Sequence, residues 1–394
     1  MDQPGFVCAV NGSRDAYQVP LALYQSGQLA RFVTDYYAPD TPPAWLPGAM
    51  ARRRSPLLPK AATVGTPLCF TAQYGAARLG LPMNRIFPHT DKLLADHAVR
   101  QAKRLGAHLY CYSSYLPQAE RIPAGMRVVD FEYHPLPGLT MDLLREDAGR
   151  YPEVAWSFAR EQRLERVEQV TESWKHADAV VCASRMTARS LEFAGCEAER
   201  ITVVPYGFET STAARARLPG GPARFLFVGQ GVQRKGLHHL LRAWRTVDPA
   251  RAQLTLVCYA IDPGIAELAD QPGVRLLGRQ ERVALDALMQ QAQVFIMPSL
   301  IEGFGLVYLE ALAAGCHVVG TENTGLPDLP LGPDARTLVP SGDIEVLAAT
   351  IERLIARHEA EGFDALAIAS EARRWTWADF RERIADHART VAAG

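Results

Sequence analysis

The sequence lacks several features that would assign it to a common class of protein. Lysine and arginine (42) nearly balance aspartate and glutamate (43), so the basic excess typical of nucleic-acid-binding proteins is missing. No apolar run reaches the roughly 18–20 residues that a membrane-spanning helix needs. The first ten residues, MDQPGFVCAV, lack the charged and apolar regions of a signal peptide. We therefore expect a soluble, cytoplasmic protein that does not bind nucleic acid.

The seven cysteines show no pairing pattern. Their number is odd, no CxxC pair occurs, and most of them lie in apolar runs such as FVCAV, AVVCAS and LVCYA. Such surroundings are typical of buried thiols in a reducing compartment, whereas small secreted proteins space their cysteines as a disulfide framework. The cysteines are therefore predicted to be free and to behave as small apolar side chains.

Two common nucleotide-binding motifs are also missing. The pattern GxxxxGK[ST] does not occur, which excludes a Walker-type phosphate site. No GxGxxG follows a predicted strand, because the segment FVGQGVQRKG lacks the third glycine at the required position. A nicotinamide-dependent oxidoreductase on Rossmann domains is therefore the less favoured alternative.

Short β-rich runs alternate with amphipathic stretches along most of the 394 residues. The predicted strands are 5–10, 30–35, 107–114, 126–135, 177–184, 201–207, 225–229, 252–260, 274–278, 293–299 and 316–321. The predicted helices are 15–28, 93–105, 152–176, 236–247, 282–292 and 305–314. Strands and helices that alternate at this spacing predict parallel βαβ units with helices on both faces of the sheet.

The Gly-, Pro- and Ala-rich segment 207–223 interrupts this alternation and is the predicted linker. We predict an α/β protein with two doubly wound, Rossmann-like domains that face each other across a cleft. They cover residues 1–207 and 208–375, and a C-terminal helix over 376–394 packs back toward the first domain. Ligands of such sheets bind beyond the carboxyl ends of the strands.

The sharpest local signal is MPSLIEGFGLVYLEALAAGCHVVGT at 297–321, which reads as strand, turn, helix and strand. Glu302 lies in the turn, and a helix is predicted to begin near Gly305. Unpaired amides and the helix dipole together bind anions at such a terminus. The amides expected to hold a phosphate are those of Gly305, Leu306 and Val307.

Glu310 follows within the next turns of the same helix, and helical side chains lean toward the N-terminus. Its carboxylate is therefore placed to accept a hydrogen bond from a ligand at the helix start. Glu302 and Glu310 around a Gly-rich turn suit a ligand that is both phosphorylated and rich in hydroxyl groups. The alternative is that both are solvated surface acids on an ordinary strand–turn–helix.

A second signal is FVGQGVQRKGLHHLL at 227–241, where another strand runs into a Gly-containing loop. The loop carries Arg234 and Lys235 directly before a predicted helix at Gly236, and two cations there would complement a diphosphate. A basic pair that merely decorates an exposed loop is the alternative. Both loops follow strands of the same domain, so we expect them to face the same cleft.

These residues carry a resemblance to a known family. The E-x7-E motif EGFGLVYLE (Glu302 to Glu310), the preceding MPS, the loop from Gly229 to Gly236 and ITVVPYGFE at the domain junction agree with it. The chain resembles family 4 of the nucleotide-sugar glycosyltransferases, which have the two-domain GT-B fold. The resemblance is strong from about Ala179 to Val339 and weaker over the first 130 residues.

The resemblance implies a role for each matching residue. Glu302 would bind hydroxyls of the transferred sugar, and Glu310 would bind the ribose hydroxyls of the nucleotide. Lys235 would neutralise the diphosphate leaving group. The remaining donor-binding residues would line the sugar, the phosphates and the base: Phe304, Gly305, Leu306, Leu277 and Gly278.

Members of this family retain the anomeric configuration and need no metal ion, and the absence of an Asp-x-Asp motif here agrees with the second property. One position departs from the family pattern, because Gln230 follows Gly229 where an arginine is usual. We expect Arg234 to replace the missing cation. If it does not, the alternative is a protein that binds a nucleotide sugar without turning it over.

The first half of the chain offers two further candidates. Gly12 and Ser13 follow the first predicted strand, where the family has a Gly-rich loop near the sugar phosphate, although the usual Gly-Gly pair is absent. His134, in DFEYHP, follows another strand and is placed by the resemblance close to the transferred sugar. A histidine that caps a Pro-rich turn is an equal alternative for His134.

Two clusters are less specific. Arg52, Arg53 and Arg54 lie near apolar residues and could form a weak peripheral membrane patch, at about 1 kcal/mol per charge, or simply a solvated loop. The remaining histidines, including His238 and His239, show no metal-site spacing and are interpreted as packing or surface residues.

The expected function is that of a retaining, metal-independent hexosyltransferase in cell-surface polysaccharide or glycolipid assembly. It would use a nucleotide diphosphate sugar and a glycan, glycolipid or small-molecule acceptor, with no bound cofactor. The predicted location is the cytoplasm, with peripheral contact at the inner face of the membrane. A polysaccharide synthase is a further possibility within the same fold.

Overall fold

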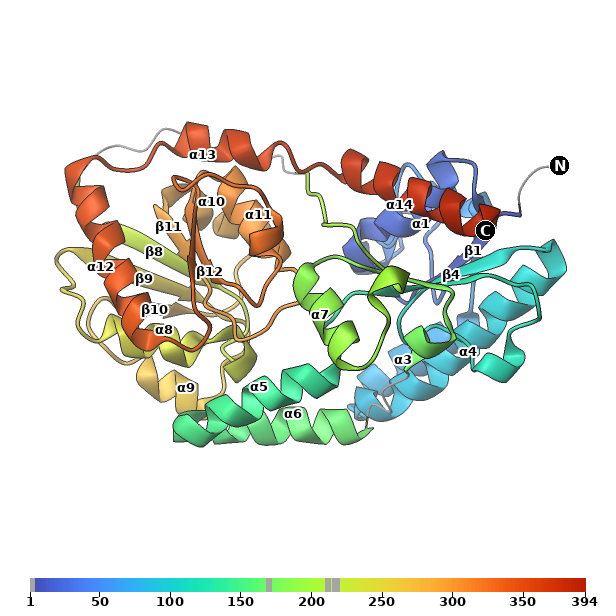
Figure 1. Ribbon diagram of the computed structural model, residues 1–394, viewed down its shortest axis with the longest axis horizontal. Helices are drawn as coiled ribbons and strands as arrows, with labels where there is room; N and C mark the ends of the chain where they lie inside the picture. The colour runs from blue at the N-terminus through green and yellow to red at the C-terminus, as the bar shows by residue number, and fades with distance from the viewer. Residues whose placement is uncertain (1–3, 168–171, 210–213, 215–219) are drawn as a thin grey trace.

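The computed structural model describes residues 4–167, 172–209, 214 and 220–394. Two parallel β-sheets lie side by side, each covered by helices (Figure 1). The predicted linker 207–223 falls partly outside the described residues. The prediction of two doubly wound α/β domains is confirmed.

The first sheet has seven strands in the order β3-β2-β1-β4-β5-β6-β7, all parallel. Its strands are β1 (Phe6–Ala9), β2 (Leu29–Thr34), β3 (Thr63–Gly65), β4 (His108–Tyr112), β5 (Val128–Glu132), β6 (Ala179–Cys182) and β7 (Ile201–Val203). The central strands are buried along their whole length, which explains why they read as continuous apolar runs. The short edge strand β3 was not predicted.

The second sheet has six parallel strands in the order β10-β9-β8-β11-β12-β13. Its strands are β8 (Ala223–Val228), β9 (Ala252–Val257), β10 (Val274–Leu277), β11 (Val294–Ile296), β12 (His317–Thr321) and β13 (Arg336–Val339). The first strand of each sheet, β1 or β8, lies in its interior, and the later strands are added outward on either side of it. The carboxyl ends of β8 and β11, which carry the two predicted loops, are therefore neighbours.

Helices cover both faces of each sheet. In the first half they are α1 (Gln18–Gln25), α2 (Gly48–Ala51), α3 (Pro67–Arg78), α4 (Met83–Leu105), α5 (Pro137–Arg150), α6 (Ala155–Val167) and α7 (Arg185–Phe193). In the second half they are α8 (Leu237–Trp244), α9 (Pro263–Leu268), α10 (Arg282–Gln291), α11 (Leu306–Ala313), α12 (Ile344–Ala360), α13 (Ala365–Ala372) and α14 (Trp377–Ala393). Within the described part of the chain, no helix is both long and apolar enough to cross a membrane.

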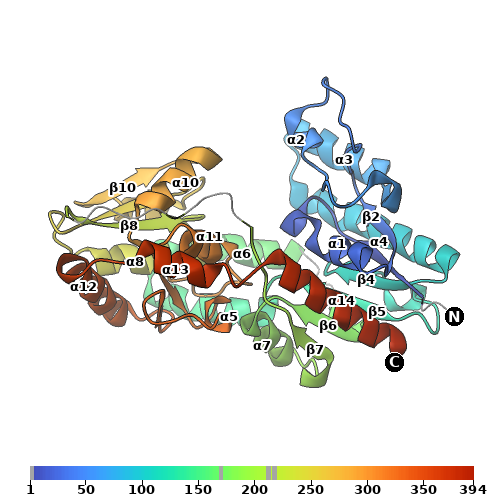
Figure 2. The same cartoon turned by 90° about the horizontal axis from the view of Figure 1, so that it is seen from above.

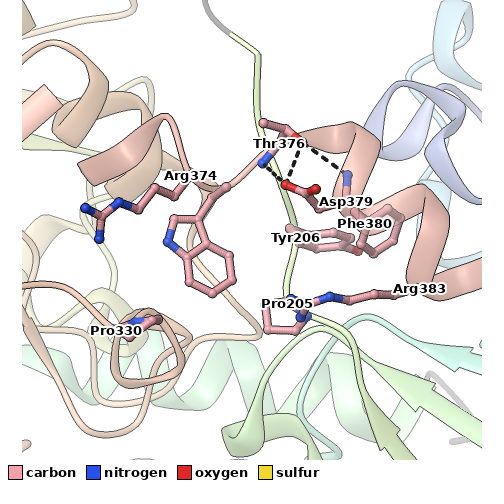
Figure 3. A pocket seen from close by; sticks show the side chains of 9 residues that line it. Pro205, Tyr206, Pro330, Arg374, Thr376, Asp379, Phe380 and Arg383 are labelled. Atoms are coloured by element: carbon pink, nitrogen blue, oxygen red, sulfur yellow. Dashed lines mark hydrogen bonds between the residues drawn. The ribbon is translucent and has the colours of Figure 1, made fainter. Parts of the chain in front are cut away.

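The last helix, α14, leaves the second domain and lies against α1 of the first (Figures 1 and 2). Arg381 donates to the side-chain oxygen of Gln18 at 2.8 Å, and Gln28 donates to the carbonyl of Ala385 at 3.0 Å. The helix starts with a capping box, in which the side chains of Thr376 and Asp379 bind each other's backbone amides (Figure 3).

Two crossings of the chain between the domains lie side by side. Phe208 donates its backbone amide to the carbonyl of Trp375 at 3.1 Å, and a cluster of aromatic rings packs around the junction. Tyr206 is at the centre of this cluster, with ring centroids of Phe304 and Phe380 both 5.4 Å away. All seven cysteines are buried and free, as predicted.

Candidate active site

The two predicted loops meet at the carboxyl edge of the second sheet. The backbone amide of Leu300 donates to the carbonyl of Arg234 at 2.9 Å. Gly236 has φ of 65°, and a Cβ there would lie 1.9 Å from the carbonyl oxygen of Pro298. Only glycine permits both this backbone conformation and this close approach. The structure therefore brings the basic loop and the acidic loop into direct contact.

Three of the predicted site residues form one charge cluster at this contact. Lys235 pairs with Oε2 of Glu302, and Nη1 of Arg234 lies 3.2 Å from the same oxygen. Burial by itself would raise the pKa of Glu302, but the nearby charges of Lys235 and Arg234 outweigh it and lower the pKa to about 2. One carboxylate and two cations leave the cluster with a net positive charge.

The ammonium group of Lys235 loses part of its hydration at this position. Its burial lowers the pKa of the ammonium group, and the carboxylate of Glu302 opposes that change. A nearby ionised carboxylate favours the charged form of an ammonium group, which burial disfavours. Glu302 is thus the counter-ion that keeps a cation at the sheet edge.

The first domain holds the acidic loop in place. The carbonyl of Gly303 accepts hydrogen bonds from the hydroxyls of Ser184 and, at 3.3 Å, Thr187, both at the start of α7. A Cβ at Gly303 would lie 2.5 Å from the carbonyl of Tyr133, so the loop packs directly on the segment after β5. The candidate site is therefore built from both domains.

The helix after the acidic loop, α11, begins at Leu306 behind Gly305, whose φ is 89°. Within the part of the chain that the structure describes, the amides of Leu306 and Val307 have no carbonyl partner in the helix, whereas the amide of Tyr308 donates to the carbonyl of Gly305 at 3.0 Å. The hydroxyl of Tyr308 donates to the carbonyl of Met297 at 2.6 Å and fixes the helix to the end of β11. The predicted strand–turn–helix is confirmed.

Glu310 lies on the same helix, farther from the charge cluster. Its Oε1 is 3.0 Å from Nη1 of Arg282 at the start of α10, and its side chain remains partly exposed. This is an exposed ion pair of the kind that contributes little to stability, so Glu310 is free to exchange partners with a ligand at low cost.

Phe304, which the resemblance places along the sugar and phosphates, has a buried side chain. Its ring packs against Tyr206 and the backbone of Gly325. Its carbonyl accepts a hydrogen bond from the amide of Gly325 at 3.0 Å. Its aromatic ring therefore fixes the loop to the domain junction and does not line the sheet edge.

The remaining predicted donor residues follow neighbouring strands of the same sheet. The amide of Gly229 donates to the carbonyl of Val257 at 3.1 Å, and the side chain of Gln230 donates to the hydroxyl of Tyr259. Leu277 ends β10, and the exposed Gly278 follows it. These residues share the carboxyl edge with the charge cluster, although none of them touches it through a hydrogen bond that the structure describes.

His134 is brought to the acidic loop from the first domain, because its Cα lies 3.5 Å from the Cβ position of Gly303. The surrounding protein, together with the positive charge of Arg14, lowers the pKa of His134 to about 4, and Glu302 opposes this shift. The histidine is therefore neutral at physiological pH. Arg14, which the sequence interpretation placed in the loop with Gly12 and Ser13 but gave no role of its own, has its guanidinium 3.7 Å from the ring centroid of Tyr133.

Gly12 and Ser13 lie after β1 as predicted, in a loop that the protein holds firmly. The amide of Gly12 donates to Oδ1 of the buried Asp35 at 3.1 Å, while Ser13 is exposed. The three residues after Arg14 all have positive φ, between 41° and 66°. Non-glycine residues in this region are strained, a feature that sequence patterns do not reveal.

The arginine cluster is only partly available to a partner. Arg53 pairs with the buried Asp35, and Arg54 donates to the carbonyl of Asp40 at 2.7 Å. Arg52 is exposed. Membrane contact through this cluster stays a prediction.

A separate small pocket lies beside the domain junction, between Tyr206 and α14 (Figure 3), away from the charge cluster.

Comparison with known proteins agrees with this geometry. Residues 222–357, which include both loops, match the family model described as "Glycosyl transferases group 1". This part of the chain is therefore similar to group 1 glycosyltransferase domains. The whole chain has the GT-B fold: it aligns with the sucrose-phosphate synthase of Thermosynechococcus elongatus with a TM-score of 0.66 at 18% identity, covering 99% of this chain and 100% of that one.

Two curated relatives are glycosyltransferases of polysaccharide biosynthesis. The putative colanic acid biosynthesis glycosyltransferase WcaL of Salmonella typhimurium is 25% identical over 235 residues, 54% of this chain and 58% of that protein. The amylovoran biosynthesis glycosyltransferase AmsK of Erwinia amylovora is 29% identical over 218 residues, 51% of this chain and 52% of that protein. The chain spans about half the length of the curated relatives it matches.

Proposed function

We propose that this glycosyltransferase moves a sugar from a nucleotide diphosphate sugar to an acceptor hydroxyl with retention of configuration. The observation that carries the proposal is the net positive cluster of Arg234, Lys235 and Glu302 beside the free amides of α11. Negative charge accumulates on the diphosphate as the glycosidic bond breaks. Preorganised cations and amides that face this charge are usually the largest contribution to catalysis.

In this proposal Arg234 and Lys235 stabilise the leaving diphosphate, and the first amides of α11 bind its oxygens. Arg234 would take the place of the missing cation of the family pattern; its contact with Glu302 and the hydrogen bond from Gln230 to Tyr259 support this assignment. Two fixed protein cations supply the charge that a metal ion supplies elsewhere, so transfer would continue in the presence of a chelator.

Glu302 would accept hydrogen bonds from hydroxyls of the transferred sugar, and His134 would face the same sugar from the first domain. A neutral imidazole can donate a hydrogen bond to a sugar or accept one from it. Glu310 would exchange Arg282 for the ribose hydroxyls. The departing phosphate oxygen takes the proton of the acceptor hydroxyl, so no protein nucleophile is needed.

For the biological role we propose assembly of a cell-surface polysaccharide or glycolipid, supported by the two relatives named for colanic acid and amylovoran biosynthesis. The donor would come from the cytoplasm. The acceptor would be a glycan or glycolipid, which makes peripheral contact with the inner face of the membrane part of the proposal.

A donor panel tests the reaction. The protein is mixed with uridine, guanosine, adenosine and thymidine diphosphate sugars in the presence of EDTA, and thermal unfolding is followed with each. A nucleotide at 100 times its dissociation constant should add about 2.7 kcal/mol to the unfolding free energy. Release of nucleoside diphosphate from the matching donor, after a glycan or glycolipid acceptor has been added to receive the sugar, then shows transfer. Binding without release would favour the non-catalytic alternative, and no binding to any donor would overturn the proposal.

A further inference from the structure

A second cluster of functional side chains lies between the two halves of the chain, away from the candidate active site. Asp147 near the end of α5 meets His238 and His239 in the first turn of α8. Nε2 of His238 is 3.0 Å from Oδ2 of Asp147, and Nε2 of His239 is 2.7 Å from Oδ1. Both histidines are at most 1% exposed.

The hydrogen bonds at this cluster are incomplete. Among the residues that the structure describes, Nδ1 of His238 and Nδ1 of His239 have no hydrogen-bond partner, and Nε2 of His239 contacts Oδ1 of Asp147 without the geometry of a hydrogen bond. Gln233 donates its Nε2 to Asp147 at 2.8 Å, yet its own side-chain oxygen is buried without a partner. Buried polar atoms are normally paired, so a cluster with this many orphans needs an explanation.

Another buried histidine in the same domain shows what a purely structural role looks like. His317 is also 1% exposed, but its Nδ1 lies 2.9 Å from the carbonyl of Asp334 and its Nε2 lies 2.9 Å from the hydroxyl of Thr337. Both of its nitrogens are satisfied within the protein. His238 and His239 differ in burying ring nitrogens that converge with a carboxylate and are not fully bonded.

Two imidazoles and one carboxylate form a ligand set that suits zinc. The candidate donor atoms of Asp147, His238 and His239 all lie within 4.8 Å of one another. One carboxylate with two imidazoles is a favourable environment for a divalent cation, and a metal bound by Nε2 of His239 would satisfy a nitrogen that makes no well-formed hydrogen bond in the structure.

We infer that Asp147, His238 and His239 form a structural Zn²⁺ site that joins α5 to α8. The site lies three residues beyond Lys235 along the chain, and Gln233 links it by a hydrogen bond to the start of the basic loop. The ion would therefore cross-link a helix from the first half of the chain to the loop that carries the candidate active-site cations. It would take no part in the transfer reaction.

Zinc binding to the full-length protein tests the inference directly. The protein is stripped with a chelator, dialysed, and titrated with ZnCl₂ against a chromophoric zinc indicator. We expect one Zn²⁺ per chain with a dissociation constant below about 1 µM. Cobalt in place of zinc should give the visible absorption bands of a low-coordinate Co²⁺ site. Failure of the wild-type protein to bind zinc with this affinity would overturn the inference, whatever the variants do.

Two variants locate the ion. His239→Gln removes one ligand and should weaken zinc binding by at least about 100-fold and abolish the cobalt spectrum. His89→Gln, on the exposed surface of α4, is the matched control and should bind zinc as the wild type does. Zinc should also raise the thermal unfolding midpoint of the control but not that of His239→Gln. Equal zinc affinity in the two variants would show that the ion binds elsewhere and would refute the site.

Discussion

Replacing Glu302 by glutamine tests whether the charge cluster is as strongly coupled as its geometry indicates. A carboxyl group whose pKa falls from 4.5 to about 2 on folding stabilises the folded protein by about 3 kcal/mol at neutral pH. Glutamine keeps the size of the side chain but removes the charge, and it leaves Lys235 buried without its counter-ion. We therefore expect Glu302→Gln to lower the unfolding free energy by about 3 kcal/mol at pH 7.

The pH dependence of this loss has a definite sign. Because folding lowers the pKa of Glu302, its contribution is fully present above pH 4.5 and is lost as the pH falls through 2. The difference between wild type and Glu302→Gln should be about 3 kcal/mol at pH 7 and about half as large at pH 3. Denaturant unfolding of both proteins at the two pH values measures it.

Two further variants complete the test. Glu310→Gln is the matched control, because its exposed pair with Arg282 should contribute less than about 1 kcal/mol. A double-mutant cycle of Glu302→Gln with Lys235→Met should give a favourable coupling energy of at least about 1 kcal/mol. A loss under about 0.5 kcal/mol at pH 7, or additive effects in the cycle, would refute the reasoning.

Three other predictions concern binding, catalysis and packing. Glu310→Gln should weaken nucleotide binding in the thermal-shift assay while changing stability little, and unchanged affinity would contradict the ribose assignment. Arg234→Gln should slow product formation by about 100-fold without preventing donor binding; a rate close to wild type would show that Arg234 does not replace the missing cation. Gly236→Ala should yield a severely destabilised protein, because a Cβ would collide with the neighbouring loop, whereas Gly149→Ala on the exposed side of α5 should fold normally, as measured by circular dichroism and denaturant unfolding.

Strands that lie in the middle of a sheet could be predicted because their burial shows directly in the sequence. The runs at 5–10 and 225–229 became β1 and β8, the central strands of the two sheets. Helices were harder to predict from the sequence than these strands. The start of α4 at Met83 was predicted ten residues too late, because Pro88 lies inside the helix, where proline normally argues against one. The segment 137–150, which forms α5, was not predicted as a helix at all.

In the candidate site, sequence patterns could predict the parts that local contacts determine but not the parts that depend on distant contacts. The turn at Glu302, the helix start at Gly305 and the basic pair at Arg234 are all encoded within short segments, so sequence patterns could find them. Which way Phe304 faces depends on packing across the domain junction, and no local pattern contains that information. The pairing of Asp147 with His238 joins positions 91 residues apart, so histidine spacing alone gave no indication of a shared cluster.

The order of the elements along the chain also does not show which domain the helices α5 and α6 pack against. They precede the second sheet in sequence, yet α6 packs against α9 of the second domain (Figure 1). Asp262, before α9, accepts hydrogen bonds from Ser157 and, at 2.8 Å, Arg160, and a Cβ at Gly264 would lie 2.2 Å from the carbonyl of Glu153. A movement of one sheet relative to the other would therefore break these contacts or the contacts between α5 and α7.

The same packing explains how a residue of the first domain can belong to the candidate site. His134 lies in the short connection between β5 and α5, with the acidic loop directly against it. One end of that connection is held by the first sheet, and the helix that follows is bound to the second domain through Gln233, which donates to the carbonyl of Leu144 at 2.8 Å. The position of His134 relative to Glu302 is thus set by contacts with both domains and does not depend on the distant crossings at Phe208 and Trp375 alone.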